Sequence, residues 1–229
     1  MQKGSSVKNL NDRLETALVA LGFALMMAAL YLIFIYVPTE KEMGVIQRIF
    51  YIHVPLAWVA FLAFFIVFIG SILYLWKRDE RWDILARSSA QIGVIFTTLV
   101  LVTGPIWAKP VWGTWWTWDA RLTASLILWL TYIGYLLVRS YAGEESRGAR
   151  MSAVLGIVGF VDVPLVYLSI KLWRTQHPRE LVSTLEGSMM LTLMVSLAAF
   201  TVLYIILLRQ TTAVRQLEAS VRELKDSQQ

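Results

Sequence analysis

The sequence predicts an all-α, polytopic membrane protein with six transmembrane helices, and three observations support this fold class. The chain has 229 residues, of which 57% are hydrophobic, and its mean hydropathy of +0.59 exceeds that of a soluble globular domain. The apolar residues gather in six continuous stretches, most of them long enough for a helix to cross a hydrocarbon core of about 30 Å. Strands of a membrane barrel would instead alternate polar and apolar residues.

The expected spans follow one another along the whole chain. They are residues 17–37, 54–76, 84–106, 122–139, 151–172 and 187–208. Helices satisfy their own backbone polar groups within lipid. The first stretch is longer than a signal-peptide core and lacks a small-residue cleavage pattern, so we expect it to remain as a helix. Since no repeat, low-complexity segment or soluble domain is visible, we expect a single domain over 1–229, with 209–229 as a cytoplasmic helical tail.

Two features of the last spans carry no assigned chemistry. Asp162 lies within the fifth span, two residues before Pro164. An ionisable group at that depth is a functional candidate. A structural role, in which Asp162 satisfies backbone groups that the proline kink frees, explains its presence equally well. The tail has aliphatic residues at helical spacing, namely Val214, Leu217, Val221 and Leu224. This spacing indicates that the sixth helix continues beyond the membrane.

Lys and Arg are divided unevenly between the two sets of connecting segments. The two tails, together with the 77–87 and 139–150 connections, carry fourteen of the 21, and the other three connections carry seven. Cytoplasmic segments are enriched in these residues, so both termini are expected in the cytoplasm. The net charge of +5 then reflects orientation and contact with anionic lipid rather than with nucleic acid.

The outward connection between the third and fourth spans is rich in tryptophan. It reads WAKPVWGTWWTWD over residues 107–119 and holds five of the ten tryptophans. Such a crowd of flat side chains provides a platform for a large flat ligand, although tryptophans also anchor proteins at bilayer interfaces. If the segment is helical, one face carries Trp112, Trp115, Trp116 and Asp119. If it is extended, one side carries Trp112, Trp116 and Trp118.

The chain has only two histidines, His53 and His177, and both fall in outward connections. Pro55 suits the first position of a helix, so His53 is expected just before a helix N-terminus, which disfavours the charged imidazolium. The neutral ring is the form that binds metals. Two imidazoles beside an aromatic platform suit a haem iron, whereas zinc would need a third outward ligand that is not evident. Either histidine taken alone is also compatible with an ordinary interfacial residue.

Charged residues near these groups complete the candidate site. Arg48 and Arg121 are expected to bind haem propionates, because a guanidinium matches carboxylate geometry. Three further cations are weaker candidates: Lys109, Arg174 and Arg179. Each of these side chains is equally suited to reaching lipid headgroups. Asp119 is expected either to hold the loop in shape or to cap the helix that begins near Leu122.

The run from Trp112 to Thr123, WGTWWTWDARLT, resembles the WWD motif of the haem-handling proteins of cytochrome c maturation. Six spans and two outward histidines make the chain similar to the haem exporter protein C (CcmC) family over nearly its whole length. Larger members of the superfamily have more spans and more histidines. The absence of cysteine excludes thiolate ligands and a self-attachment motif for haem.

The resemblance implies that haem b is bound as cargo at the periplasmic face of a bacterial inner membrane. His53 and His177 would be its axial ligands, and a second group of residues would cradle the porphyrin: Trp112, Trp115, Trp116, Trp118 and Asp119. Haem would then pass to the periplasmic chaperone CcmE. An ABC transporter of CcmA and CcmB, with the small subunit CcmD, would use ATP to release the loaded chaperone. Since this chain has no Gly-rich phosphate loop, another subunit must hydrolyse the nucleotide.

Two other functional classes stay open at this stage, a transmembrane haem transporter and an electron carrier. A haem transporter would line a path through the spans with polar groups, but the spans hold almost none, Gln91 and Asp162 being exceptions. An electron carrier similar to a b-type cytochrome would stack two haems between histidines within its helices. Two histidines at one surface can bind only one haem.

Overall fold

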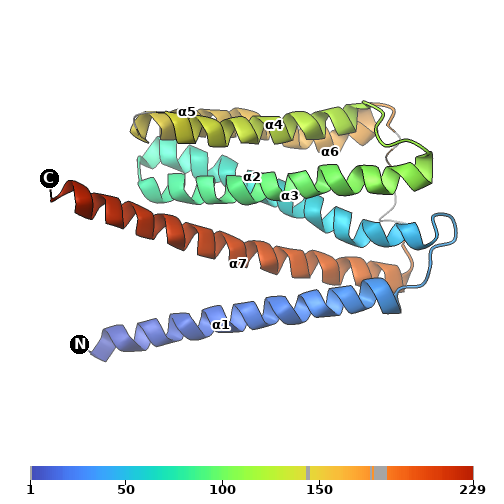
Figure 1. Cartoon of the computed structure of the whole chain (residues 1–229), viewed down its shortest axis with the longest axis horizontal. Helices are drawn as coiled ribbons and strands as arrows, with labels where there is room; N and C mark the ends of the chain where they lie inside the picture. Colours follow the sequence, from blue (N-terminus) through green and yellow to red (C-terminus); the bar gives the residue numbers. More distant parts are fainter. Residues whose placement is uncertain (1, 143–144, 176, 178–184, 229) are drawn as a thin grey trace.

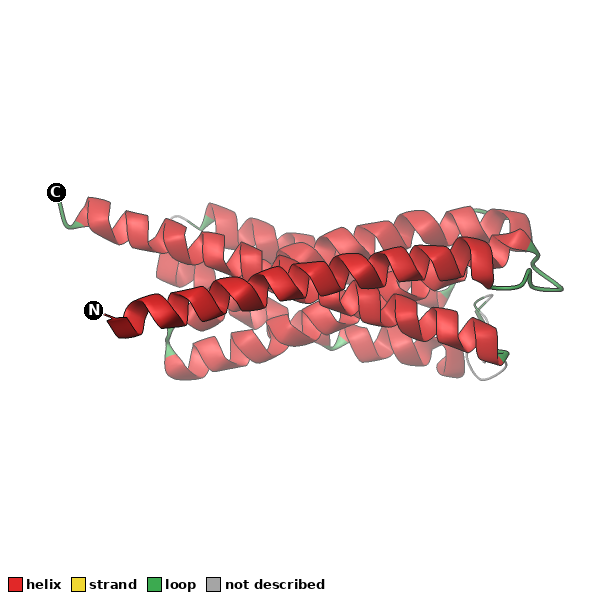
Figure 2. Cartoon of the chain, turned by 90° about the horizontal axis from the view of Figure 1, so that it is seen from below, coloured by secondary structure: helices red, strands yellow, loops and turns green. Residues whose placement is uncertain are grey.

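The computed structural model describes residues 2–142, 145–175, 177 and 185–228. Throughout these residues the regular secondary structure is helical. Six helical segments are long and apolar enough to cross a membrane, which confirms the predicted fold class. Figure 1 shows the helices aligned along the long axis of the molecule, and Figure 2 shows the same arrangement after a quarter turn.

The chain order of the elements is simple. They are α1 (Gln2–Tyr31), the π-helical turn η1 (Leu32–Tyr36), the 3₁₀ turn η2 (Val45–Ile49), α2 (Phe50–Lys77), α3 (Glu80–Trp112), α4 (Ala120–Tyr141), α5 (Glu145–Phe160), α6 (Asp162–Leu172) and α7 (Gly187–Asp226). Both termini lie at one end of the bundle, and the connections after η1 and α3 lie at the other (Figure 1). A chain that crosses the bundle an even number of times returns to the end at which it began, so its two termini lie together.

The start of α2 corrects one expectation. Pro55 lies inside α2 rather than at its first position, because the turn η2 runs directly into a helix that begins at Phe50. As the sixth residue of α2, Pro55 has no N–H with which to form the backbone hydrogen bond of that turn. His53 therefore lies in the first turn of α2 and not before it.

The end of α3 also differs from the expected boundary at 106. The helix continues through Pro105 and Pro110 to Trp112. It ends at Gly113, which has φ of +76° and donates its N–H to the Lys109 carbonyl at 3.0 Å. Only glycine takes this left-handed conformation without a steric penalty, so Gly113 is a natural helix terminator. Two tryptophans of the supposed loop, Trp107 and Trp112, consequently belong to a helix.

The fifth span is divided into two helices. α5 and α6 are separated at Val161, close to Pro164. This break is the proline kink that the sequence indicated. Asp162 begins α6, and its Oδ2 atom is buried with no hydrogen-bond partner in the described structure.

The best-packed part of the bundle lies between α2, α3, α4 and α6. The rings of Phe64 and Tyr132 stack there with centroids 3.8 Å apart. Nearer the termini, Arg139 of α4 donates to Asp83 of α3 through Nη2 at 2.8 Å and Nε at 3.0 Å. Both side chains of this ion pair are almost fully buried. α1 lies at the edge of the bundle, where its main partner is α7. This frame leaves the opposite end of α2, α3 and α4 to form the site.

Candidate functional site

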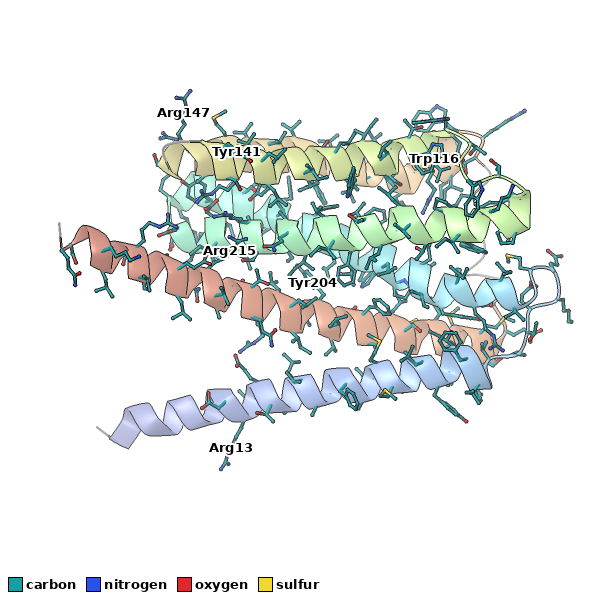
Figure 3. The ribbon with its side chains drawn as sticks, viewed as in Figure 1. Arg13, Trp116, Tyr141, Arg147, Tyr204 and Arg215 are labelled. Carbon is teal, nitrogen blue, oxygen red and sulfur yellow. The ribbon has the colours of Figure 1, made fainter. Side chains whose placement is uncertain are left out.

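A cavity of about 940 Å³, part of it open to solvent, lies between α2, α3, α4, α6 and the 113–119 connection. Figure 3 shows Trp116, one of its lining residues, at the end of the bundle where α3 and α4 are joined. The cavity brings together seven of the predicted site residues: His53, Trp112, Trp115, Trp116, Asp119, Arg121 and His177. Trp118 and Arg48 are not among its lining residues.

His53 enters the cavity from the first turn of α2 and is 8% exposed. Its Nδ1 atom lies 2.8 Å from the Thr103 hydroxyl on α3. Its ring meets the edge of the Trp107 indole, with centroids 5.9 Å apart. The imidazole is therefore held by α3 on two sides while it lines the cavity.

His177 approaches the same indole from the segment that follows α6. Its ring centroid lies 6.4 Å from that of Trp107, again edge-on, and its backbone N–H donates to the Thr175 hydroxyl at 3.1 Å. The two imidazole centroids can therefore be no further apart than the sum of their distances to Trp107. Arg179, two residues on, lies outside the described residues.

Trp107 is the site residue whose role the sequence did not reveal. It is 2% exposed, and it also contacts Phe50 and Trp112 at centroid distances of 6.1 Å. A helical continuation of α3 would have placed it one turn after Thr103, on the same face. Because Pro105 and Pro110 suggested that the helix ends earlier, the sequence did not place Trp107 on this helix face.

The rest of the tryptophan segment, residues 113–118, forms neither a helix nor a strand. Gly113 and Trp118 both have positive φ, at +76° and +55°. A positive φ is rare for a bulky residue and is concentrated at functional sites. Trp116 is half-buried in the cavity, and the 69% exposed Trp118 packs edge-on against it at 5.6 Å. Trp115 lines the cavity but is 56% exposed.

Asp119 both shapes the loop and caps α4. Its Oδ1 accepts the backbone N–H groups of Arg121 at 2.9 Å and Leu122 at 3.2 Å. Its Oδ2 accepts the Thr117 hydroxyl at 3.0 Å. The two roles considered from the sequence are thus filled by the same carboxylate, which fixes the loop to the start of α4.

Three N–H donors that belong to cavity-lining residues are buried without a hydrogen-bond partner in the described structure. They are Nε1 of Trp107, Nε1 of Trp116 and Nη1 of Arg121. Buried polar groups are nearly always satisfied in native proteins, so this cluster suits a ligand with acceptor oxygens. Arg48 also has a buried Nε without a partner in the described structure, but it does not line the cavity, and its Nη1 donates to the Phe34 carbonyl at 2.7 Å.

The fold and the site together define a class: polytopic helical membrane proteins with an aromatic, imidazole-bearing cavity at one end of the bundle. The family model described as heme exporter protein C matches residues 1–227. The chain therefore belongs to the haem exporter protein C family, whose members take part in cytochrome c biogenesis.

Individual relatives agree with this assignment. The heme exporter protein C of Bradyrhizobium diazoefficiens is 38% identical over 175 residues, which cover 74% of this chain and 66% of the relative, just under two thirds of its length. That of Haemophilus influenzae is 35% identical over 175 residues, covering 74% and 71%. A putative cytochrome c biosynthesis ccmC-like mitochondrial protein of Marchantia polymorpha is 32% identical over 181 residues, covering 78% and 77%.

Proposed function

We propose that the protein holds haem b as cargo in the cavity and delivers it to the chaperone CcmE during c-type cytochrome maturation. The observation that carries the proposal is the position of the two histidines. They are the only ones in the chain, they come from segments far apart in sequence, and they meet at one indole in one cavity. An iron with two axial ligands requires such a pairing.

Each part of the cavity has a role in this proposal. His53 and His177 bind the iron, and Trp112, Trp115 and Trp116 stack on the porphyrin and exclude water. Trp118 supports Trp116 from outside, and Asp119 holds the loop in place. Arg121 and the two indole N–H groups supply donors for the propionates. The exposed indoles at the rim provide the type of surface that protein interfaces favour, which suits contact with a chaperone.

The setting of this activity is also part of the proposal. The excess of Lys and Arg at the end with both termini favours a bacterial inner membrane protein with its termini in the cytoplasm and its cavity at the periplasmic face. The complex would include CcmA, CcmB and CcmD, with CcmA and CcmB as the source of ATP-driven release.

The cavity does not favour the two alternative functions. On α2 its lining ends near the middle of the helix, at Phe61, and on α3 it begins near the middle, at Thr97. Among the described residues the lining thus covers only half of the bundle and gives no polar path across it, as a transporter would need. The single histidine pair leaves no site for the second haem of a b-type electron carrier.

Spectroscopy of the purified protein with added hemin tests the ligand assignment. His53→Ala and His177→Ala should each change the Soret and α/β bands, because each removes one axial ligand. Circular dichroism of the variants controls for loss of fold. If both variants keep the wild-type bands, the assignment of the two histidines is wrong.

A transfer assay tests delivery. Hemin-loaded protein is mixed with CcmE, and haem bound covalently to the chaperone is measured against a free hemin control. The proposal expects more transfer from the loaded protein than from free hemin. Equal transfer would rule out a delivery role.

A further inference from the structure

We propose that Thr103 is a positioning residue for His53, and that its hydroxyl fixes the imidazole in the tautomer whose lone pair is on Nε2. The importance of this tautomer rests on the proposed function, in which His53 is an iron ligand. The hydrogen-bond geometry that supports it does not depend on haem.

The second hydrogen bond of Thr103 favours one tautomer of His53. The Oγ1 atom donates to the Leu99 carbonyl at 2.8 Å, one turn earlier in α3. A hydroxyl has a single hydrogen, so towards His53 it can offer only a lone pair. With the hydroxyl hydrogen on the Leu99 carbonyl, it is His53 Nδ1, at 2.8 Å, that carries the hydrogen of this second bond. In a neutral imidazole this places the free lone pair on Nε2, the nitrogen on the far side of the ring from Thr103.

The packing around His53 holds the ring as well as its proton. A Cβ atom at the neighbouring Gly104 would lie 3.5 Å from His53 Cε1, in van der Waals contact. Trp107 meets the ring edge-on. Positions 103, 104 and 107 lie on the same face of a helix, so a single face of α3 determines both the position and the tautomer of the ligand. Partners of this kind orient metal-binding histidines in proteins generally.

The same helix contains a natural control for this hydrogen bond. Thr98 Oγ1 donates to the Val94 carbonyl at 2.8 Å and accepts Nε1–H of Trp129, also at 2.8 Å. Its chemistry is that of Thr103, but its partner is an indole that cannot change tautomer. A Thr→Val substitution keeps the β-branched shape at either position and removes one hydroxyl from α3.

Nitrogen-15 NMR of the full-length protein with labelled histidine, in detergent and without hemin, measures the tautomer directly. With only two histidines in the chain, a His177→Gln variant identifies the signals of His53. We expect the Nδ1–H tautomer in the wild type, a shift toward Nε2–H in Thr103→Val, and no shift in Thr103→Ser or Thr98→Val. An Nε2–H tautomer in the wild type, or an unchanged tautomer in Thr103→Val, would overturn the proposal.

Hemin binding measures the consequence for the metal. Loss of such a partner weakens metal binding by about 10- to 100-fold, so Thr103→Val should show a decrease of that size, with Thr103→Ser and Thr98→Val near the wild type. The haem midpoint potential should become more positive, because the ligand donates less electron density. If His53→Ala binds hemin as the wild type does, the proposed function fails, and the tautomer measured without hemin still decides the role of Thr103. Wild-type affinity and potential in Thr103→Val would contradict that role.

Discussion

At the scale of single residues, the unsatisfied donors of the cavity are the most direct indication of the chemistry of its ligand. A buried N–H without an acceptor costs about 1–3 kcal/mol, and three such groups belong to residues that line one cavity. A porphyrin with two carboxylates would remove this cost. A purely apolar ligand would not, so the donors favour an anionic one.

Arg121→Ala should weaken hemin binding without changing the ligation of the iron. Removing a charged hydrogen bond to a propionate costs about 1.5–3 kcal/mol, which a hemin titration measures, while the Soret band keeps its wild-type position. Arg48→Ala is the matched control, because Arg48 donates to a backbone carbonyl and does not line the cavity. Equal losses in both variants would remove Arg121 from the propionate site.

Residue type in the sequence singled out both histidines and most of the tryptophans that line the cavity, but not which arginine lines it. Arg48 was a candidate because it is five residues from His53. It lies on η2, the turn that precedes the helix of His53, and its guanidinium donates to the Phe34 carbonyl of η1 instead. Nearness along the chain does not determine the direction of a long side chain, and only the packed structure does.

At the scale of secondary structure, the ends of the helices determine the shape of the site. α4 begins at Asp119, whose carboxylate accepts two backbone N–H groups. α3 begins in the same way at Asp79, at the opposite end of the bundle, where the carboxylate accepts the Arg81 N–H at 3.0 Å. The two caps are alike in chemistry, but only the first adjoins the cavity.

Asp119→Ala should lower both stability and hemin binding, because it releases the tryptophan loop from α4. Loss of a helix cap costs about 0.5–2 kcal/mol, measurable as a decrease in thermal stability in detergent. Asp79→Ala should lower stability to a similar degree and leave hemin affinity unchanged. The result that contradicts this view is equal loss of hemin binding in the two variants.

The helix boundaries show what local sequence signals can and cannot predict. The kink near Pro164 was evident, because a proline within a long apolar span has few alternatives. The end of α3 was placed too early, since Pro105 and Pro110 suggested a loop, while the terminator was Gly113. The fold of the tryptophan connection was left open and depends on positive φ at Trp118, for which tryptophan as a residue type gives no indication.

At the scale of the whole molecule, the cavity and the termini lie at opposite ends of the bundle. Figure 3 shows Arg13, Arg147 and Arg215 toward the end with the termini and Trp116 at the other. The number of spans followed from hydropathy alone, since lipid demands continuous apolar helices. The packing partners did not, because hydropathy does not distinguish apolar side chains that face lipid from those that face another helix.

The orientation can be measured with single cysteines, because the natural chain has none. Lys41→Cys, in the connection before η2, should react with a membrane-impermeant maleimide on intact spheroplasts. Ser227→Cys, after α7, should react only once the membrane is permeabilised, because the excess of Lys and Arg places the termini inside. The unsubstituted protein is the control for background labelling. The reverse pattern would invert the proposed topology.

The crowding of indoles around the two imidazoles has an optical consequence. Trp107, Trp112, Trp115 and Trp116 all line the cavity, and an excited indole that close to a porphyrin loses its energy to it rather than emitting light. Intrinsic fluorescence should therefore dim as the cavity fills and recover as it empties. The chain thus contains its own reporter, which could follow loading and release in real time without any added dye.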